Sequence, residues 1–282
     1  GGPEGPGGDP VKFGITANPE IATALKAARA IVTLLEKRHE IVLETELAKA
    51  LDRRGKAIEG LNAEVMLAIG GDGTVLRALQ RTAAKVLGIN SGSLGFLTEV
   101  TAVEFPAALK RLEKGDYAVE ERLKVRVTVD GRRLPDCANE AVVHTANIAK
   151  IRHFEIHVNG SVAERVRADG VIVATPTGST SYSMSVGGPI VDPHVDALVI
   201  STIAPFKPSA RPIVVPSTAQ VRVSIVKPRE CLLVLDGQHE VALAGTEELR
   251  FTGSPERARL VKFGEDFYRR IEEKLVGRGG QR

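Results

Sequence analysis

The segment with the clearest chemical potential is Gly70-Gly71-Asp72-Gly73-Thr74, which lies between an apolar run and a helical pattern. Three glycines permit a tight turn and bring backbone N–H groups close to a ligand, and the start of the next helix favours phosphate. A carboxylate beside phosphates is unfavourable unless it binds a metal or accepts a proton. Asp72 is therefore a candidate general base. Taken alone, the pattern fits a strand–helix turn capped by Asp72 about equally well.

Two other phosphate-binding patterns do not fit this segment. A dinucleotide fingerprint needs a third small residue where Leu76 stands, and a Walker A loop needs a lysine that does not follow these glycines. The chain is therefore expected to bind phosphate by a different arrangement.

A second glycine-containing loop, residues 90–97 (NSGSLGFL), ends the next apolar run. Because parallel sheets bind ligands beyond the carboxyl ends of their strands, this loop and the first one should be neighbours. Phe96 could stack on an aromatic base, although an ordinary loop with a core phenylalanine is the more frequent alternative.

Residues 167–189 (RADGVIVATPTGSTSYSMSVGGP) form the second dense cluster of candidate residues. An apolar strand ends at Pro176, and the glycine, hydroxyl and tyrosine residues that follow can surround a nucleoside. We expect Thr180 and Ser181 to meet polar edges, Tyr182 to meet the base and Asp169 to meet an amide or hydroxyl. The alternative is a plain Ser/Thr-rich turn.

Three weaker features also concern candidate chemistry. Asn139-Glu140 can hold a ribose diol because a carboxylate accepts from both hydroxyls. Asp236-Gly237-Gln238 also fits a type I′ hairpin turn. The scattered histidines and the two distant cysteines, Cys137 and Cys231, predict neither a metal site nor a disulfide.

The elements that position these residues change character along the chain. Up to about residue 115, apolar runs at 11–16, 40–44, 64–70 and 85–90 alternate with helical patterns at 19–37, 46–54 and 74–83, with Ile21, Leu25, Ala28, Val32 and Leu35 predicted on one buried face. This predicts an α/β domain with an open parallel sheet. From about residue 122, period-two alternation around Asp130-Gly131, Asn159-Gly160 and Asp236-Gly237 predicts a β-rich, mostly antiparallel domain.

We therefore expect four parts. These are a flexible lead-in at 1–10, an α/β domain at 11–120 with the GGDG segment, a β-rich domain at 121–263, and a C-terminal helix and tail at 264–282 whose helix returns to the first domain.

Composition excludes several classes of protein. The 282 residues include 43% hydrophobic and 26% charged residues, unlike disordered, collagen-like or coiled-coil chains. A net charge of +3 is too small to indicate nucleic acid as the main partner. No apolar run reaches the roughly 18–20 residues of a membrane span, and the first residues lack the charged, apolar and small-residue pattern typical of a signal peptide. We expect a cytoplasmic protein with no membrane partner.

Together the motifs resemble the NAD kinase family. The family pattern appears in order at 70–74, 90–97, 139–140, 169–191, 204–214 and 236–238, so the resemblance covers about residues 11–270. The string at 167–191 is highly specific, whereas GGDG alone also fits phosphofructokinases and diacylglycerol-type lipid kinases. The resemblance implies transfer of the terminal phosphoryl group of ATP, or polyphosphate in some relatives, to the 2′-hydroxyl of the adenosine ribose of NAD. A divalent metal, Mg²⁺ carried by ATP, is the implied cofactor.

The resemblance also implies the residue roles. Asp72 would accept the proton, Arg77 would lie near the phosphates, Asp169 and Ala204 would meet the nicotinamide amide, and Gln238 would close the site. The implied NAD-binding set is Asp72, Gly73, Arg77, Phe96, Asn139, Glu140, Lys150, Arg167, Asp169, Thr180, Ser181, Tyr182, Ser185, Ala204 and Gln238. Gly70, Gly71, Gly73 and Thr74 would form the phosphate loop, and no residue is assigned to a metal.

Family members assemble as homodimers or homotetramers, which is the assembly expected here. This chain departs from the family pattern at two places: Ser181 replaces the usual alanine, and Ala204–Ser209 replaces the commoner Ser-Pro-x-x-Leu-Ser.

Overall fold

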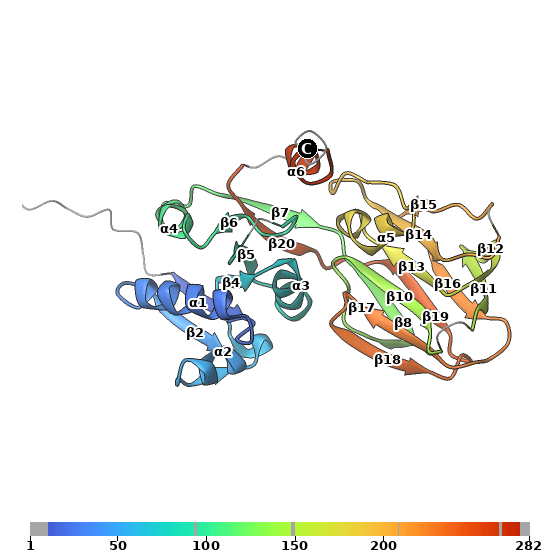
Figure 1. Cartoon of the computed structure of the whole chain (residues 1–282), viewed down its shortest axis with the longest axis horizontal. Helices are drawn as coiled ribbons and strands as arrows, with labels where there is room; N and C mark the ends of the chain where they lie inside the picture. Colours follow the sequence, from blue (N-terminus) through green and yellow to red (C-terminus); the bar gives the residue numbers. More distant parts are fainter. Residues whose placement is uncertain (1–10, 93–94, 148–149, 208, 265–266, 277–282) are drawn as a thin grey trace, which may run out of the picture. The chain divides into compact units, whose positions relative to one another are not determined.

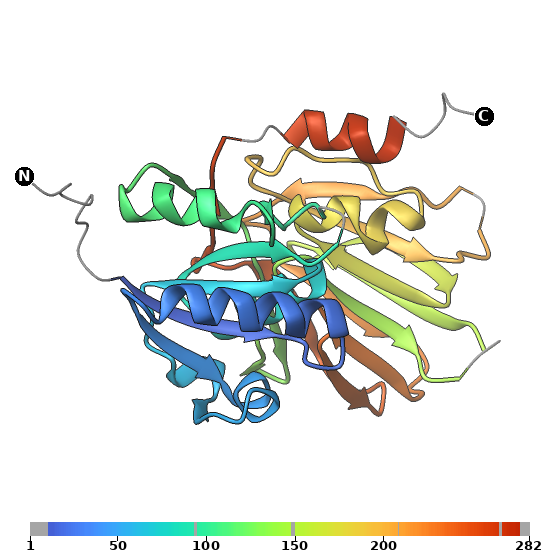
Figure 2. The same cartoon turned by 60° about the vertical axis from the view of Figure 1, so that its left-hand side comes forward.

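The computed structural model describes residues 11–92, 95–147, 150–207, 209–264 and 267–276 (Figures 1 and 2). The predicted lead-in at 1–10 lies outside the described residues. The chain divides into two compact units, of which the first runs to Glu121 and resumes at Arg259, and the second runs from Arg122 to Ala258.

The first unit is built on one mostly parallel sheet. Its strand order is β3-β2-β1-β4-β5-β20-β7, with β6 beside β5. The strands are β1 (Lys12–Ala17), β2 (Glu40–Glu44), β3 (Gly55–Lys56), β4 (Val65–Gly70), β5 (Lys85–Asn90), β6 (Val100–Thr101), β7 (Ala118–Arg122) and β20 (Ala258–Lys262). Every residue of β4 is buried, which is the burial that its unbroken apolar run predicts for a central parallel strand.

Helices cover both faces of this sheet. The helices are α1 (Ala22–Leu35), α2 (Thr45–Ala50), η1 (Ile58–Gly60), α3 (Asp72–Arg81) and α4 (Phe105–Glu113). Helices α1 and α4 share a core cluster with Leu87 and Ile89, and Figure 2 shows α1 lying along the first strands. On β5, Gly88 lies between Leu87 and Ile89 and therefore faces the other side of the sheet. Val75 of α3 lies against Gly88, so α3 covers that opposite face.

One expectation for α1 was wrong. The helix begins at Ala22 rather than Pro19, and Ile21, predicted on the buried face, is its N-cap and 45% exposed. An N-cap residue has extended backbone dihedrals, so its side chain leaves the helical face that the spacing predicts.

The second unit is a sandwich of two six-stranded antiparallel sheets. One sheet has the order β15-β14-β13-β10-β17-β18 and the other β12-β11-β16-β19-β8-β9. The first contains β10 (Glu140–Thr145), β13 (Gly170–Ala174), β14 (Ala197–Ile203), β15 (Ile213–Pro216), β17 (Cys231–Leu235) and β18 (His239–Leu243). The second contains β8 (Val125–Val129), β9 (Arg132–Arg133), β11 (Arg152–Val158), β12 (Ser161–Ala168), β16 (Val221–Ile225) and β19 (Leu249–Gly253). One cluster of fully buried side chains, including Val127 and Phe154 from one sheet and Val143 and Leu233 from the other, joins the two sheets.

The three predicted hairpin turns join their strands as expected. Asp130, Asn159 and Asp236 have φ near +50°, and the glycine that follows each also has positive φ. These are the left-handed conformations that a type I′ turn requires. The expected fold class, α/β followed by an antiparallel β-rich part, is confirmed.

Short helices complete both units. In the second unit, η2 (Thr177–Thr180) and α5 (Tyr182–Ser185) follow β13. In the first, α6 (Phe267–Ile271) continues as the π-helical turn η3 (Glu272–Val276). This final helix belongs to the first unit, as expected. Among the described residues, none of the helices has the length and apolar character that would let it cross a membrane.

Candidate active site

The carboxylate of Asp72 is held by the neighbouring loop. Gly70 and Asn90 pair at the ends of β4 and β5, so the loops that follow these strands are neighbours, as predicted. Asp72 Oδ2 accepts a hydrogen bond from the N–H of Phe96 at 2.7 Å. Its Oδ1 accepts from the N–H groups of Leu97 at 3.0 Å and Thr98 at 3.2 Å. Since the N-cap of α3 is Gly71, Asp72 lies in the first turn and its carboxylate serves the loop instead of capping the helix.

Gly95 makes this close approach possible. A Cβ atom at this position would collide with the Asp72 carboxylate. The Gly95 N–H donates to Thr98 Oγ1 at 2.6 Å, and Asn90 Nδ2 donates to the same oxygen at 3.3 Å. The segment Gly95–Thr98 is therefore a fixed turn built around Asp72. Gly95 belongs to the predicted 90–97 loop, but neither Gly95 nor Thr98 is among the site residues that the sequence predicts.

The glycine segment that precedes Asp72 leaves its backbone accessible. Gly71 and Gly73 are exposed, and space is open where a Cβ atom of Gly71 would lie. Thr74 is buried and donates its N–H to the carbonyl of Gly71 at 3.0 Å. The first N–H groups of a helix lack partners within the helix, so this exposed start of α3 suits a phosphate group.

Arg77 lies one turn further along α3 and reaches the ends of two other strands. Its Nη2 donates to Thr16 Oγ1 at 2.6 Å and to Glu44 Oε2 at 3.3 Å. Glu44 is buried and also accepts from the N–H of Leu47 at 3.4 Å. Arg77 is therefore fixed at the carboxyl edge of the sheet, where α/β sheets bind ligands.

In the second unit, Asn139 and Glu140 lie at the start of β10 on a buried carboxylate. Asp236 Oδ2 accepts from the N–H of Ala138 at 2.7 Å, and Oδ1 accepts from the N–H groups of Asn139 at 2.8 Å and Glu140 at 3.1 Å. On the other side, Gly178 touches the Asn139 carbonyl so closely that a Cβ atom would collide with it. The Asp236-Gly237 turn therefore connects two strands and also fixes the backbone at residues 138–140.

Two acceptor atoms at this position lack donors. Asn139 Oδ1 and Glu140 Oε2 are buried and have no hydrogen-bond partner among the described residues. Buried polar atoms in proteins are nearly always satisfied, so these two oxygens are available to accept hydrogen bonds from a ligand or from water. Adjacent hydroxyl groups of a sugar would supply such donors.

Burial controls the protonation of both carboxyl groups. Burial and, to a smaller extent, the negative charge of Asp236 raise the pKa of Glu140 to about 8, against the lowering effect of a hydrogen bond from Ser181. Burial likewise raises the pKa of Asp236 to about 6, against the lowering effect of its three backbone N–H donors and of Lys124. Ser181, where this chain departs from the family pattern, thus contacts Glu140 directly.

Comparison with known proteins identifies the family of this chain. The model of the ATP-NAD kinase N-terminal domain matches residues 13–117, and that of the ATP-NAD kinase C-terminal domain matches residues 138–263. The NAD kinase of Thermoplasma volcanium is 46% identical over 88% of this chain and 92% of its own length. That of Methanothermobacter thermautotrophicus is 41% identical over 95% and 98%. The chain belongs to the ATP-NAD kinase family.

Solved structures of ATP-NAD kinase relatives share the fold. An NAD kinase from Archaeoglobus fulgidus in complex with ATP is 29% identical, with a TM-score of 0.71 over 93% of this chain and 98% of that one. Yeast NADH kinase complexed with NADH has a TM-score of 0.88 over 97% and 89% of the two chains. At 22% identity, the yeast structure supports the fold alone.

Several other residues expected from the ATP-NAD kinase pattern gather in the second unit. The Asp169 N–H donates to the Ile203 carbonyl at 2.9 Å, which brings Asp169 next to Ala204. The Phe206 N–H donates to the Arg167 carbonyl at 2.8 Å, and the Arg167 guanidinium lies 4.8 Å from the Phe206 ring centroid. Ala204 has φ +45°, a conformation that is strained for alanine.

The remaining expected residues occupy varied surroundings. Thr180 donates its hydroxyl to the Thr177 carbonyl at 3.2 Å, and Tyr182 is 37% exposed. In the first unit, Phe96 is partly exposed, and Lys274 Nζ lies 5.3 Å from its ring centroid. Three further expected residues, Ser185, Lys150 and Gln238, are exposed. Lys150 lines a cavity of about 600 Å³ with Arg152 and Arg229.

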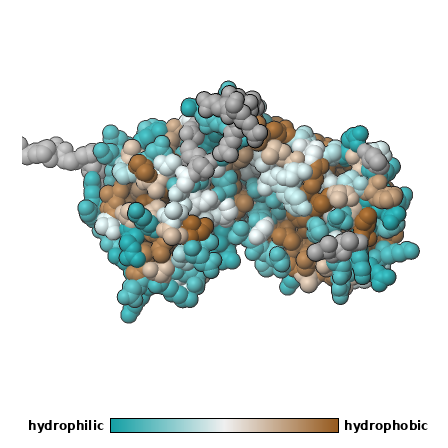
Figure 3. Space-filling view, in the orientation of Figure 1, coloured by the Kyte–Doolittle hydropathy of each residue, from teal (hydrophilic) through white to brown (hydrophobic). Residues whose placement is uncertain are grey.

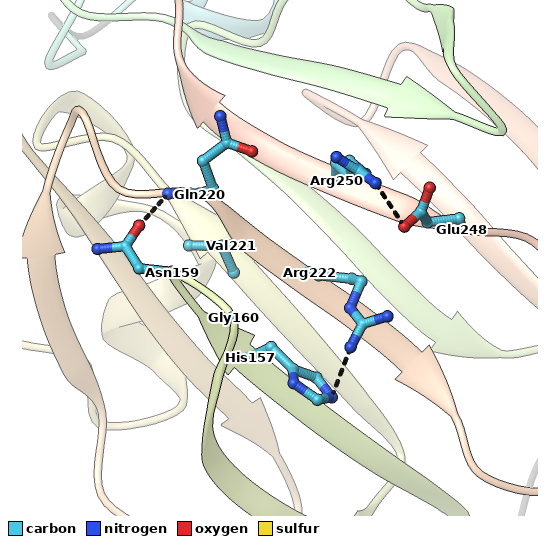
Figure 4. A pocket seen from close by; sticks show the side chains of 8 residues that line it. All are labelled: His157, Asn159, Gly160, Gln220, Val221, Arg222, Glu248 and Arg250. Atoms are coloured by element: carbon cyan, nitrogen blue, oxygen red, sulfur yellow. Dashed lines mark hydrogen bonds and ion pairs between the residues drawn. The ribbon is translucent and has the colours of Figure 1, made fainter.

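A separate cavity on β11, β16 and β19 contains none of the expected site residues. It measures about 450 Å³, and several of its polar side chains contact one another (Figure 4). Arg222 lies 3.1 Å from His157, and Arg250 pairs with Glu248 at 2.8 Å. Among the described residues, no group of three or more His, Cys, Asp or Glu side chains suits a metal ion.

Proposed function

We propose that this enzyme transfers the terminal phosphoryl group of ATP to the 2′-hydroxyl of the adenosine ribose of NAD and releases NADP and ADP. The observation that carries the proposal is the geometry of Asp72. Its carboxylate is fixed by three backbone N–H groups beside an exposed helix start, in a chain that matches both ATP-NAD kinase domains.

Phosphoryl transfer requires mainly positioning and charge neutralisation from the protein, with no covalent enzyme intermediate. The ribose O2′ forms a bond to the γ-phosphorus, the bond from that phosphorus to the bridging oxygen breaks, and ADP leaves with the electron pair. We propose that Asp72 orients the 2′-hydroxyl and accepts its proton, while the first N–H groups of α3 neutralise phosphate oxygens. Mg²⁺ enters as part of the MgATP substrate, where it neutralises phosphate charge.

We propose that the second unit recognises the dinucleotide. The unpaired oxygens of Asn139 and Glu140 would accept hydrogen bonds from ribose hydroxyls. Of the other residues, Phe96, Thr180, Ser181 and Tyr182 would surround the adenosine, and Asp169, Ser185 and Ala204 would meet the nicotinamide end. Gly73, Arg77, Lys150, Arg167 and Gln238 would complete the contacts to the dinucleotide.

Donor, assembly and compartment are also proposals. We propose ATP as the donor and a homodimer or homotetramer as the working form, and an assay with polyphosphate tests the donor directly. We propose the cytoplasm as the compartment, because NAD and ATP are both available there and the two cysteines are free thiols.

Replacing Asp72 by asparagine tests the proposed base. The asparagine side chain would keep the size and one acceptor oxygen but could not take a proton, and general base catalysis contributes about 10²–10⁴-fold. We expect Asp72→Asn to lose most of kcat while KM for NAD changes little. The measurement is NADP formation from NAD and MgATP.

The matched control is Asp52→Asn, which alters an exposed aspartate in the same unit. It should retain wild-type constants. A kcat for Asp72→Asn within a few-fold of wild type would exclude Asp72 as the base, and NAD binding without any turnover by the wild type would defeat the proposed activity.

A further inference from the structure

Arg270 on α6 lies behind the turn that holds Asp72. Its side chain is buried, with only 4% of the residue exposed. Nη1 donates to the carbonyl oxygens of Phe96 at 3.1 Å and Gly95 at 3.3 Å, and also to that of Thr98. Nη2 donates to Glu99 Oε2 at 2.9 Å. One guanidinium group thus contacts the Gly95–Thr98 turn from the side opposite to Asp72.

The two sets of contacts share the same peptide groups. The Gly95 carbonyl and the Phe96 N–H belong to one planar peptide unit, and the Phe96 carbonyl and the Leu97 N–H belong to the next. In each unit the N–H donates to Asp72 while the carbonyl accepts from Arg270. Because the trans peptide is rigid, fixing the carbonyl fixes the direction of the N–H. A cation on the carbonyl also polarises the N–H and strengthens its bond to the carboxylate.

Arg270 is itself held by a buried carboxylate. Glu99 Oε2 accepts from Lys262 Nζ at 2.6 Å as well as from Arg270, and Glu99 Oε1 accepts from the Phe263 N–H at 2.7 Å. Burial lowers the pKa of Lys262, whereas Glu99 acts in the opposite direction. Glu99 thus holds both the Arg270 guanidinium and the Lys262 ammonium behind the turn that fixes Asp72.

We propose that Arg270 is a positioning residue for Asp72, acting through the peptide units 95–96 and 96–97 to aim the carboxylate at the hydroxyl it deprotonates. The proposal rests on the proposed role of Asp72 as the base. An arginine is required because its planar fork reaches several carbonyls and a carboxylate together, which a lysine ammonium does not.

The test compares Arg270→Lys and Arg270→Met with Arg269→Met. Arg269 is the matched control, since it is adjacent on α6, exposed, and paired with Glu273 at 3.0 Å. A displacement of about 1 Å at a reacting group costs on the order of 100-fold in rate. We expect both Arg270 variants to lose about 10- to 100-fold in kcat with KM for NAD and ATP within about threefold. Arg269→Met should match the wild type.

Melting temperatures separate this role from simple stabilisation. Assays are run well below the melting temperature of each variant, so that the folded fraction is complete. If Arg270→Lys melts earlier but keeps the wild-type kcat, Arg270 only stabilises the fold and the proposal is overturned.

A double-mutant cycle with Asp72→Asn then tests the coupling. If Arg270 acts through Asp72, adding Arg270→Lys to Asp72→Asn should lower kcat by less than about twofold, whereas independent effects would multiply. Multiplied losses overturn the proposal. An active Asp72→Asn enzyme defeats the proposed base itself, whereas an inactive one beside a normal Arg270→Lys enzyme defeats only this inference.

Discussion

Glu140 stands at the start of β10 with one carboxylate oxygen that has no donor among the described residues. Burial and the nearby Asp236 raise the pKa of Glu140 to about 8, so its carboxyl group is mostly protonated at neutral pH in the free protein. Ribose hydroxyls that donate to this residue would favour the ionised form. If Glu140 binds the ribose as proposed, we expect ligand binding to release a proton from this side chain.

This protonation makes stability depend on pH. The folded-state pKa of Glu140 lies above its ordinary value of 4.5, so its contribution is fully present below about pH 4.5 and is lost as pH rises through 8. We expect the melting temperature of the ligand-free protein to fall between pH 5 and 8. Glu140→Gln should flatten the fall most strongly between pH 6 and 8, because Asp236, with a pKa of about 6, contributes at the lower end.

Thermal unfolding at a series of pH values measures this effect, and Glu20→Gln, at an exposed glutamate, is the control. The assignment to Glu140 would be wrong if Glu140→Gln kept the wild-type slope.

At the scale of elements, the loop after β5 can approach the Asp72 carboxylate because residue 95 is glycine. Gly95→Ala would push a methyl group into the Asp72 carboxylate, so the turn or the carboxylate must move. A shift of this kind should lower kcat by about 10- to 100-fold with a smaller change in KM for NAD. Gly92→Ala is the matched control in the same loop, since its Cβ atom would meet Asn90 Oδ1 at an ordinary 3.6 Å.

Steady-state kinetics of the two variants decides the point. Equal activity for Gly95→Ala and Gly92→Ala would show that the turn does not fix the position of Asp72.

Sequence patterns predicted most elements because local rules determine them. Strands β2 and β5 have the predicted bounds, and the Asp-Gly and Asn-Gly turns form where a positive φ is needed. The contacts that tune the site join distant residues. The hydrogen bonds that Asp236 accepts from the start of β10 join residues 96 to 98 positions apart in the sequence. The hairpin-turn pattern alone accounts for an aspartate at 236, so the sequence shows no sign of these additional contacts. Arg270 is one of two adjacent arginines in a short helix, so nothing local distinguishes it from Arg269.

At the scale of the whole molecule, the sandwich has edge strands that another chain could cover. Strands β15, β18, β12 and β9 end the two six-stranded sheets. Val214 on β15 and Val162 on β12 are exposed, and Figure 3 shows hydrophobic side chains at the surface in scattered groups among hydrophilic ones. Exposed sheet edges favour pairing between chains.

We therefore expect a homodimer or homotetramer at micromolar concentration. Sedimentation velocity measured alongside activity checks this expectation. A monomer that remains fully active across that range would contradict it.

The two units hold their key aspartates in the same way. Asp72 accepts from three successive N–H groups at 96–98, and Asp236 accepts from three at 138–140. These donors belong to the main chain, so an alanine scan across either triplet would leave all of them in place and overlook them. Proline is the one coded residue that deletes such a donor, and amide-to-ester replacement by chemical synthesis would remove them one at a time. Substitution by any coded residue other than proline thus changes the side chains at both triplets but keeps the N–H donors to the two carboxylates.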